Sequence, residues 1–99
     1  NINFNGKAIT LKSENGAATT IIDANDSGTV VTFNSGESSS SVIDGFTITN
    51  GDSYYGAGMY IVLDSSPAVL NCIITNNAGT KWGGGVHISS SSPIFTDCE

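Results

Sequence analysis

The stretch that decides the fold is residues 56–76, GAGMYIVLDSSPAVLNCIITN, because most of its pattern returns in residues 83–99, GGGVHISSSSPIFTDCE. The Ser-Ser-Pro triplet at 65–67 recurs at 91–93, a spacing of 26, and the glycine-led block at 56–61 recurs at 83–88, a spacing of 27. Self-similarity with a period of about 20–50 residues is the sequence signature of solenoids, propellers and repeat arrays. The chain is therefore expected to be built from stacked, similar units.

The same period also extends towards the N-terminus. Phe46, Cys72 and Cys98 follow one another at a constant spacing of 26. The segment 47–50, TITN, aligns with 73–76, IITN. We expect these aligned residues to stack on one another, with Phe46 and the two cysteines inside.

Each period contains short segments in which apolar and polar residues alternate. The clearest triplets are Val31-Thr32-Phe33, Phe46-Thr47-Ile48, Met59-Tyr60-Ile61 and Val86-His87-Ile88. Period-two alternation in β-branched and aromatic residues is typical of strands, and the intervening Gly, Asn, Ser and Pro are turn residues. If each period closes one coil and the coils stack about 4.8 Å apart, the chain is an all-β parallel β-helix. We predict three to four coils of about 26–27 residues each.

Two corner files are expected from the same alignment. Asn50 stacks on Asn76 at a bend, because asparagine tolerates the left-handed backbone conformation, and stacked amides can bond from coil to coil. A second, polar file is formed by Ser39, Ser65 and Ser91. In the N-terminal third, 9–11 and 20–22 look like strands of an earlier coil, and their register stays open.

Several of these segments resemble bacterial extracellular β-helix repeat proteins. The opening, 6–16 with 20–23, resembles the start of such proteins, and 42–51, 83–86 and 91–93 are similar to their repeating core. The resemblance implies the right-handed, single-stranded parallel β-helix of the pectin-lyase-like fold. It also implies secretion or display at the cell surface, including association with an outer membrane.

The resemblance further implies a chain much longer than the 99 residues, so that 1–99 would be a partial β-helix domain. The element at 83–86 also resembles the short repeat of chlamydial polymorphic outer-membrane proteins. Their companion Phe-x-x-Asn motif is not matched, since Asn50 follows Phe46 at the fourth place.

The charge balance excludes several classes of partner. The chain has three lysines, no arginine and nine acidic residues, which give a net charge of −6. Binding to nucleic acid, to anionic membranes or to polyanionic glycans needs clustered cations, which this chain lacks. Its unbroken apolar runs are also too short to span a bilayer.

Enzymes of the resembled fold cleave polysaccharides, which raises a catalytic alternative to a binding role. Its lyases use a basic side chain beside Ca²⁺, and its hydrolases use paired aspartates on neighbouring strands. Here the lysines are scattered, and Asp44 aligns with Leu70 instead of another acid. We expect no catalytic residue within this chain. The alternative is a fragment of a polysaccharide lyase or glycoside hydrolase whose catalytic coils lie outside it.

No metal or cofactor site is expected. The segment 23–28, DANDSG, has oxygen ligands in a calcium-like order, but a solvated Asx-turn is favoured because no distal bidentate acid follows. Cys72 and Cys98 could form a disulfide in an oxidising compartment. Two buried thiols are favoured, because side chains in one file point the same way.

The candidate site is aromatic. Tyr55 and Trp82 directly precede the glycine turns at a spacing of 27, and Tyr60 and His87 have the same spacing. In stacked coils these four side chains would form a ribbon on one side of the solenoid. Aromatic faces with polar tips suit neutral sugar rings or a protein partner. The alternative is that they simply fold onto the glycine turns.

The sequence thus predicts a non-catalytic structural or binding scaffold of a secreted or cell-surface protein, such as an adhesin or a glycan-binding stalk. The expected partner is a polysaccharide or a protein of a host or cell surface.

Overall fold

The computed structural model describes residues 1–99 and contains thirteen short strands and no helix. The strands are β1 (Ile2–Asn3), β2 (Thr10–Lys12), β3 (Ile21–Asp23), β4 (Val31–Phe33), β5 (Val42–Asp44), β6 (Thr47–Thr49), β7 (Asp52–Tyr55), β8 (Met59–Ile61), β9 (Ala68–Leu70), β10 (Ile73–Thr75), β11 (Ala78–Trp82), β12 (Val86–Ile88) and β13 (Ile94–Thr96). Because no helix is present, none could cross a membrane.

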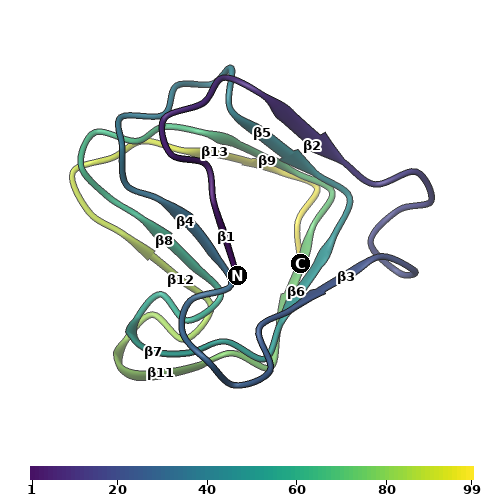
Figure 1. Cartoon of the computed structure of the whole chain (residues 1–99), viewed down its shortest axis with the longest axis vertical. Coiled ribbons are helices and arrows are strands. Elements are labelled where there is room, and N and C mark those ends of the chain that lie inside the picture. The colour runs from purple at the N-terminus through teal and green to yellow at the C-terminus, as the bar shows by residue number, and fades with distance from the viewer.

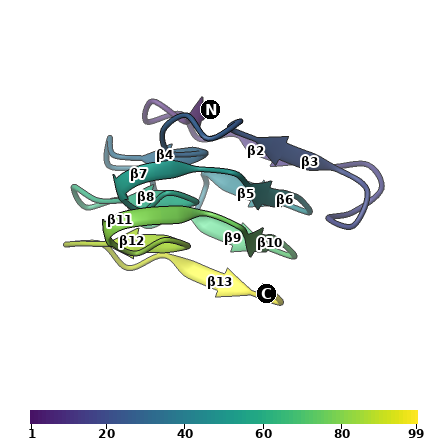
Figure 2. The ribbon, with the colours of Figure 1, turned by 90° about the horizontal axis from the view of Figure 1, so that it is seen from below.

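The strands pair with one another only in parallel and form four narrow sheets around a common axis. Their orders are β1-β4-β8-β12, β2-β5-β9-β13, β3-β6-β10 and β7-β11. Neighbouring strands in every sheet come from successive coils, so the chain is a parallel β-solenoid of about four coils, as predicted (Figure 1). In Figure 1 the chain runs clockwise from β1 through β2 to β3. Figure 2, seen from below, shows the later coils beneath the first, so that in Figure 1 they lie farther from the viewer, which makes the winding right-handed.

The register confirms the repeat in the later coils. Ile74 pairs with Ile48 at a spacing of 26, and Val86 pairs with Met59 at a spacing of 27. Asp44 lies beside Leu70 and Thr47 beside Ile73, as the alignment requires.

The first coil departs from the period because one of its corners is longer. Strand β2 pairs with β5 at a spacing of 32, with Leu11 beside Ile43, whereas β3 returns to a spacing of 26. The segment 13–20 forms the corner that 45–46 forms one coil later. These six additional residues explain why the register could not be read from the sequence.

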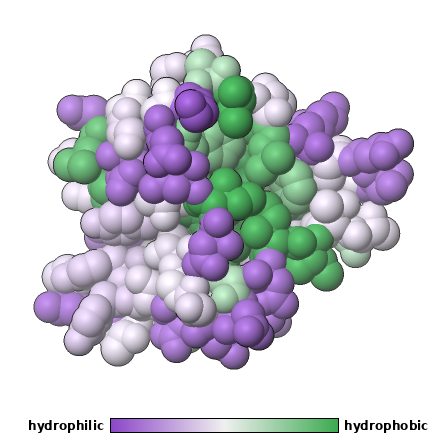
Figure 3. Space-filling view, viewed as in Figure 1, coloured by the Kyte–Doolittle hydropathy of each residue, from purple (hydrophilic) through white to green (hydrophobic).

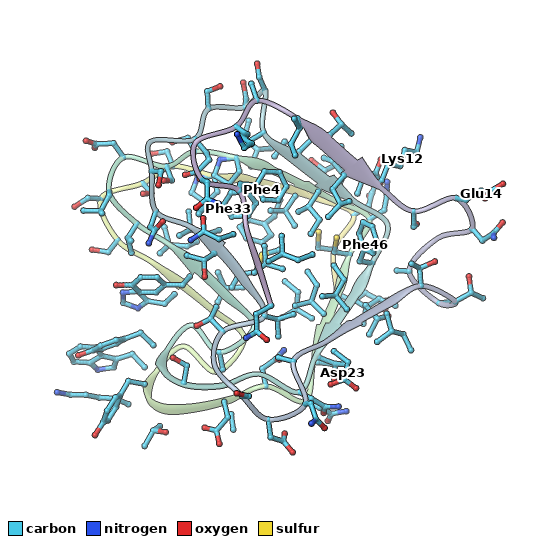
Figure 4. All side chains as sticks on the ribbon, viewed as in Figure 1. Phe4, Lys12, Glu14, Asp23, Phe33 and Phe46 are labelled. Atoms are coloured by element: carbon cyan, nitrogen blue, oxygen red, sulfur yellow. The ribbon has the colours of Figure 1, made fainter.

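The side chains that point inward from the strands fill the interior. The fully buried side chains include Phe33, Ile43, Ile48, Met59, Ile61 and Val69. Figure 4 shows Phe4, Phe33 and Phe46 pointing into the coil, whereas Lys12, Glu14 and Asp23 point outward. The rings of Phe4 and Phe33 are 4.5 Å apart. Figure 3 shows this apolar interior reaching the surface at the first-coil end of the solenoid.

The asparagine corner is confirmed in its backbone and corrected in its side chains. Asn50 and Asn76 have φ of 57° and 55°, and the Asn50 N–H donates to the carbonyl of Asn76 at 3.2 Å. The Asn50 amide donates instead to Asp23, with a distance of 3.0 Å between Nδ2 and Oδ2. The carboxylate is the stronger acceptor because it is charged, and it ties the second coil to the first.

A second left-handed file lies at the neighbouring corner and was missed. Gly45, Asn71 and Asp97 have φ of 85°, 51° and 54° and follow one another at a spacing of 26. Asn71 repeats the pattern of Asn50, since its Nδ2 donates to Oδ1 of Asp44 at 3.0 Å. The spacing alone could have revealed this file, because glycine, asparagine and aspartate are the residues that best tolerate this conformation.

The serine file is only partly as predicted. The Ser65 N–H donates to Oγ of Ser91 at 3.0 Å, but Ser39 is exposed and is not part of the file. Glu37 takes its place beneath Ser65 and accepts the Ser65 hydroxyl at 2.9 Å. The loop between β4 and β5 is longer than the later ones, and this difference brings Glu37 into the file.

Candidate binding surface

The structure brings the four predicted aromatic residues together on one side of the solenoid. Tyr55 lies beside Trp82 across β7 and β11, and Tyr60 lies beside His87 across β8 and β12. The ring centroids are 5.1 Å apart in the first pair and 5.6 Å in the second, and both pairs are stacked. Tyr55 also lies 5.5 Å from His87, which joins the two pairs. We call Tyr55, Tyr60, Trp82 and His87 the aromatic cluster.

The glycine turns make this arrangement possible. Gly56 and Gly83 have φ of 54° and 59°, so the chain reverses sharply between β7 and β8 and between β11 and β12. A Cβ atom on Gly56 would overlap the carbonyl group of Met59. Tyr55 and Tyr60 therefore stand on neighbouring strands of one coil with their rings 6.5 Å apart.

The four rings are in contact with one another on this side of the solenoid. Each ring covers part of a neighbouring ring, and three of the four side chains are half-buried. Trp82 remains 55% exposed. The polar atoms of the cluster make no hydrogen bond within the protein, so their donors and acceptors are free for a partner.

Two further residues extend the cluster and were missed. Tyr54 is 66% exposed, and its ring lies 6.2 Å from that of Tyr55. Lys81 places Nζ 4.8 Å from the centroid of the Trp82 ring, within reach of a cation–π interaction. Tyr54 and Lys81 also lie at a spacing of 27, so the same period could have identified them.

A hollow of about 350 Å³ adjoins the aromatic cluster. The rings of Tyr60 and His87 line it on the cluster side, and Val62 and Leu63 add apolar surface. Its remaining lining residues are Asn34, Ser89 and Ser90. Nothing in the sequence alignment pointed to this hollow, because the loops that form it differ in length between coils.

The acidic segment 23–28 forms the predicted Asx-turn. The N–H of Asn25 donates to Oδ1 of Asp23 at 2.7 Å, and Oδ2 of Asp23 accepts the Asn50 amide. Both carboxylate oxygens of Asp23 are therefore engaged with protein donors.

Both cysteines are free thiols inside the solenoid. Sγ of Cys72 lies 3.2 Å from the carbonyl oxygen of Leu70, and Sγ of Cys98 lies 3.4 Å from that of Val69. Burial raises the pKa of the Cys72 thiol, and hydrogen bonds from the backbone around Phe46 offset only part of that effect. The two thiols are unbridged, as favoured, but only Cys72 is buried, and Cys98 in the last coil is half-buried.

Comparisons of the chain with protein-family models, with curated proteins and with solved structures give no match. The architecture is nevertheless plain from the strand pairing alone. The chain is a parallel β-solenoid of about four coils that carries an aromatic cluster and an adjoining hollow on one side.

Proposed function

We propose that this chain is a non-catalytic binding scaffold that presents the aromatic cluster to a neutral polysaccharide. It would act as an adhesin-like or glycan-binding stalk of a secreted or cell-surface protein. We propose further that it belongs with the bacterial extracellular β-helix repeat proteins of the pectin-lyase-like fold. That residues 1–99 are part of a longer solenoid stays a prediction.

The observation that carries the proposal is the stacking of Tyr55 on Trp82 and of Tyr60 on His87 across successive coils. A rigid ladder of strands holds both pairs, so little side-chain freedom is lost when a partner binds. Apolar ring surface beside unpaired hydroxyl, indole and imidazole groups matches a sugar ring, which has apolar C–H faces and polar edges.

Charge supports a neutral partner. Lys81 is the only lysine in contact with the cluster, and the whole chain carries a net charge of −6. A polyanionic glycan would meet long-range repulsion and too few cations to offset it. Neutral chains of hexose or pentose units would meet no such repulsion.

The contacts around the acids favour binding over cleavage. His87 contacts three aromatic rings and forms no hydrogen bond to a carboxylate. Asp23 and Asp44 each accept an asparagine amide at a corner of the solenoid. Glycoside hydrolysis needs two carboxyl groups about 5–10 Å apart and facing the same bond.

The test is the affinity of the double variant Tyr55→Ala/Trp82→Ala for neutral gluco-, xylo- and manno-hexasaccharides, measured by titration calorimetry. Truncating central aromatic side chains of a binding surface costs about 2 kcal/mol or more each. We therefore expect the affinity to fall at least ~100-fold.

The matched control is Ile9→Ala/Ile21→Ala, which removes two exposed apolar side chains that lie outside the cluster. It should bind like the unmodified chain. Circular dichroism must show that both double variants remain folded. An unchanged affinity in the Tyr55→Ala/Trp82→Ala variant would overturn the proposal, as would the absence of hexasaccharide binding by the unmodified chain. Binding of a surface protein alone would assign the cluster to the other class of partner.

A further inference from the structure

We propose that the hollow beside Tyr60 and His87 is a subsite that receives one neutral sugar residue of a chain whose neighbouring residues contact the aromatic cluster. This inference rests on the proposed function and adds to it the position and chemistry of a specific contact. It assigns a role to the hollow's lining residues, Asn34, Leu63, Ser89 and Ser90.

The hollow has the size and position of a small-molecule site. Its volume of about 350 Å³ lies at the lower end of the range of about 300–1,000 Å³ that is usual for ligand pockets. A hollow of this size suits a single ring better than a long segment of polymer. It is continuous with the cluster, because Tyr60 and His87 belong to both.

Three polar residues, Asn34, Ser89 and Ser90, line the hollow and have free hydrogen-bonding capacity. The Asn34 amide oxygen accepts a hydrogen bond from the Ser35 hydroxyl at 3.3 Å, while its amide nitrogen has no partner in the protein. The side-chain hydroxyls of Ser89 and Ser90 also form no hydrogen bond within the protein. The register places Asn34 and Ser89 on the coils either side of Val62, so the amide and the hydroxyls can bond hydroxyls at different edges of a sugar ring.

Apolar side chains line the hollow as well. Val62 is 7% exposed, and Leu63 is 66% exposed. Together with the Tyr60 and His87 rings, they add apolar surface to the polar lining of the hollow. A sugar ring, which has C–H groups on its faces and hydroxyls on its edges, fits such a mixed lining.

The backbone around the hollow is held in an uncommon conformation. Leu63 and Asp64 have φ of 58° and 59°, and Ser90, one period after Leu63, has φ of 50°. Leucine is a poor occupant of this region, and such residues persist where the surrounding structure holds them, often at functional sites. The conformation keeps the large Leu63 side chain at the hollow and exposed to solvent.

The electrostatics define the class of ligand. No carboxylate and no lysine lines the hollow, and His87 is its one imidazole. An acidic sugar would find no lysine or arginine there, and a basic sugar no carboxylate. The subsite is therefore expected to take an uncharged hexose or pentose unit.

The test compares Ser89→Leu and Asn34→Ala with a control, Ser40→Leu, in hexasaccharide titrations of the whole 99-residue chain. Ser89→Leu fills the hollow and removes a hydroxyl, so its affinity should fall at least ~10-fold. Asn34→Ala removes one hydrogen-bonding group, and a fall of about fivefold is expected. Ser40 lies on an exposed loop and does not line the hollow, so Ser40→Leu should change the affinity less than ~2-fold.

The outcomes separate this inference from the proposed function. If the unmodified chain binds a hexasaccharide and Ser89→Leu binds it equally well, the hollow is not a subsite, whereas the cluster remains a binding surface. If the unmodified chain binds none of the hexasaccharides, both are overturned. A loss in Ser89→Leu and Asn34→Ala that is absent from Ser40→Leu supports the subsite.

Discussion

A Gly58→Ala variant will lose at least ~3 kcal/mol of folding free energy, because its added methyl group would press against backbone atoms that cannot move aside easily. A Cβ atom on Gly58 would overlap the carbonyl oxygen of Gly85 on the next coil. It would also lie only 2.9 Å from Nδ2 of Asn77 and 2.9 Å from a methyl carbon of Ile74. Relief would require the two coils to separate.

The surrounding hydrogen bonds make that separation costly. The N–H of Gly58 donates to the carbonyl of Gly84 at 3.0 Å, and the carbonyl of Gly58 accepts from Val31 at 3.0 Å. Asn77 is held in place as well, since its Nδ2 donates to the carbonyl of Ile48 at 3.1 Å. A shift at Gly58 would therefore disturb the pairing of three coils.

Gly85 provides the matched control because it occupies the same position one coil later. A Cβ atom there meets only the Ile74 methyl group at 3.7 Å, which is ordinary contact. Gly85→Ala should change stability by less than ~0.5 kcal/mol in the 99-residue chain. Urea unfolding followed by circular dichroism measures both variants. Equal losses in the two would contradict the coil stacking described here.

Replacing Glu37 with alanine is expected to cost about 3 kcal/mol, since it leaves the buried Ser65 hydroxyl and the part-buried N–H groups of Gly6 and Ser35 without their charged acceptor. The Glu37 residue is 2% exposed. Its carboxylate accepts the N–H of Gly6 at 2.9 Å, the N–H of Ser35 at 2.8 Å and the Ser65 hydroxyl at 2.9 Å. These donors come from three successive coils, so one side chain holds the coils together.

The same contacts predict how stability depends on pH. Burial alone would raise the pKa of Glu37, but the hydrogen bonds from Gly6, Ser35 and Ser65 outweigh it and hold the pKa below the ordinary value of 4.5. A carboxyl group whose pKa is lower in the folded state stabilises the fold fully above its unfolded pKa. That contribution is lost as the pH falls through the ordinary value and then through the lower folded value.

Glu37→Gln isolates this effect. The glutamine keeps one acceptor oxygen but turns an amide towards donors, so a loss of about 2 kcal/mol is expected at neutral pH. Its stability should also decline less than that of the unmodified chain between neutral pH and acid. Glu14→Gln, at an exposed loop, should follow the unmodified chain. If the stability of Glu37→Gln and that of the unmodified chain fell in parallel as the pH was lowered, Glu37 would have no such role.

The fold could be predicted largely from the sequence because stacking leaves a direct mark on it. Ile48 stacks on Ile74 inside the solenoid, and Met59 stacks on Val86. Both residues of each pair must therefore be apolar, and the pattern repeats with the period of the coils. The register of the first coil could not be predicted in this way, because the corner at 13–20 is six residues longer than its counterpart at 45–46. An alignment that uses one fixed period does not detect strand pairing across such an insertion.

Glu37 could not be predicted, because an isolated acid among serines and a glycine suggests an exposed loop. Its burial depends on donors from Gly6, Ser35 and Ser65, which lie 31, 2 and 28 residues away. No single repeat spacing relates these residues to one another.

The members of the candidate site were predicted from the sequence, whereas the contacts between the two stacked pairs were not. The period of 27 places Tyr55 by Trp82 and Tyr60 by His87, as observed. Their packing into a cluster depends on the angle of the glycine turns, which composition does not specify. The hollow depends in addition on the left-handed backbone at Leu63 and Ser90, and neither leucine nor serine is a residue type that favours this conformation.

The most direct test of the central claim, that successive coils present the aromatic cluster and the hollow as one saccharide-binding surface, is a nuclear magnetic resonance titration with neutral hexasaccharides. We expect saturable shift changes concentrated at Tyr55, Tyr60, Trp82, His87 and the hollow's serines, and little change along β2, β5 and β9. Shift changes concentrated on those three strands, or a spectrum that no saccharide alters, would contradict the account.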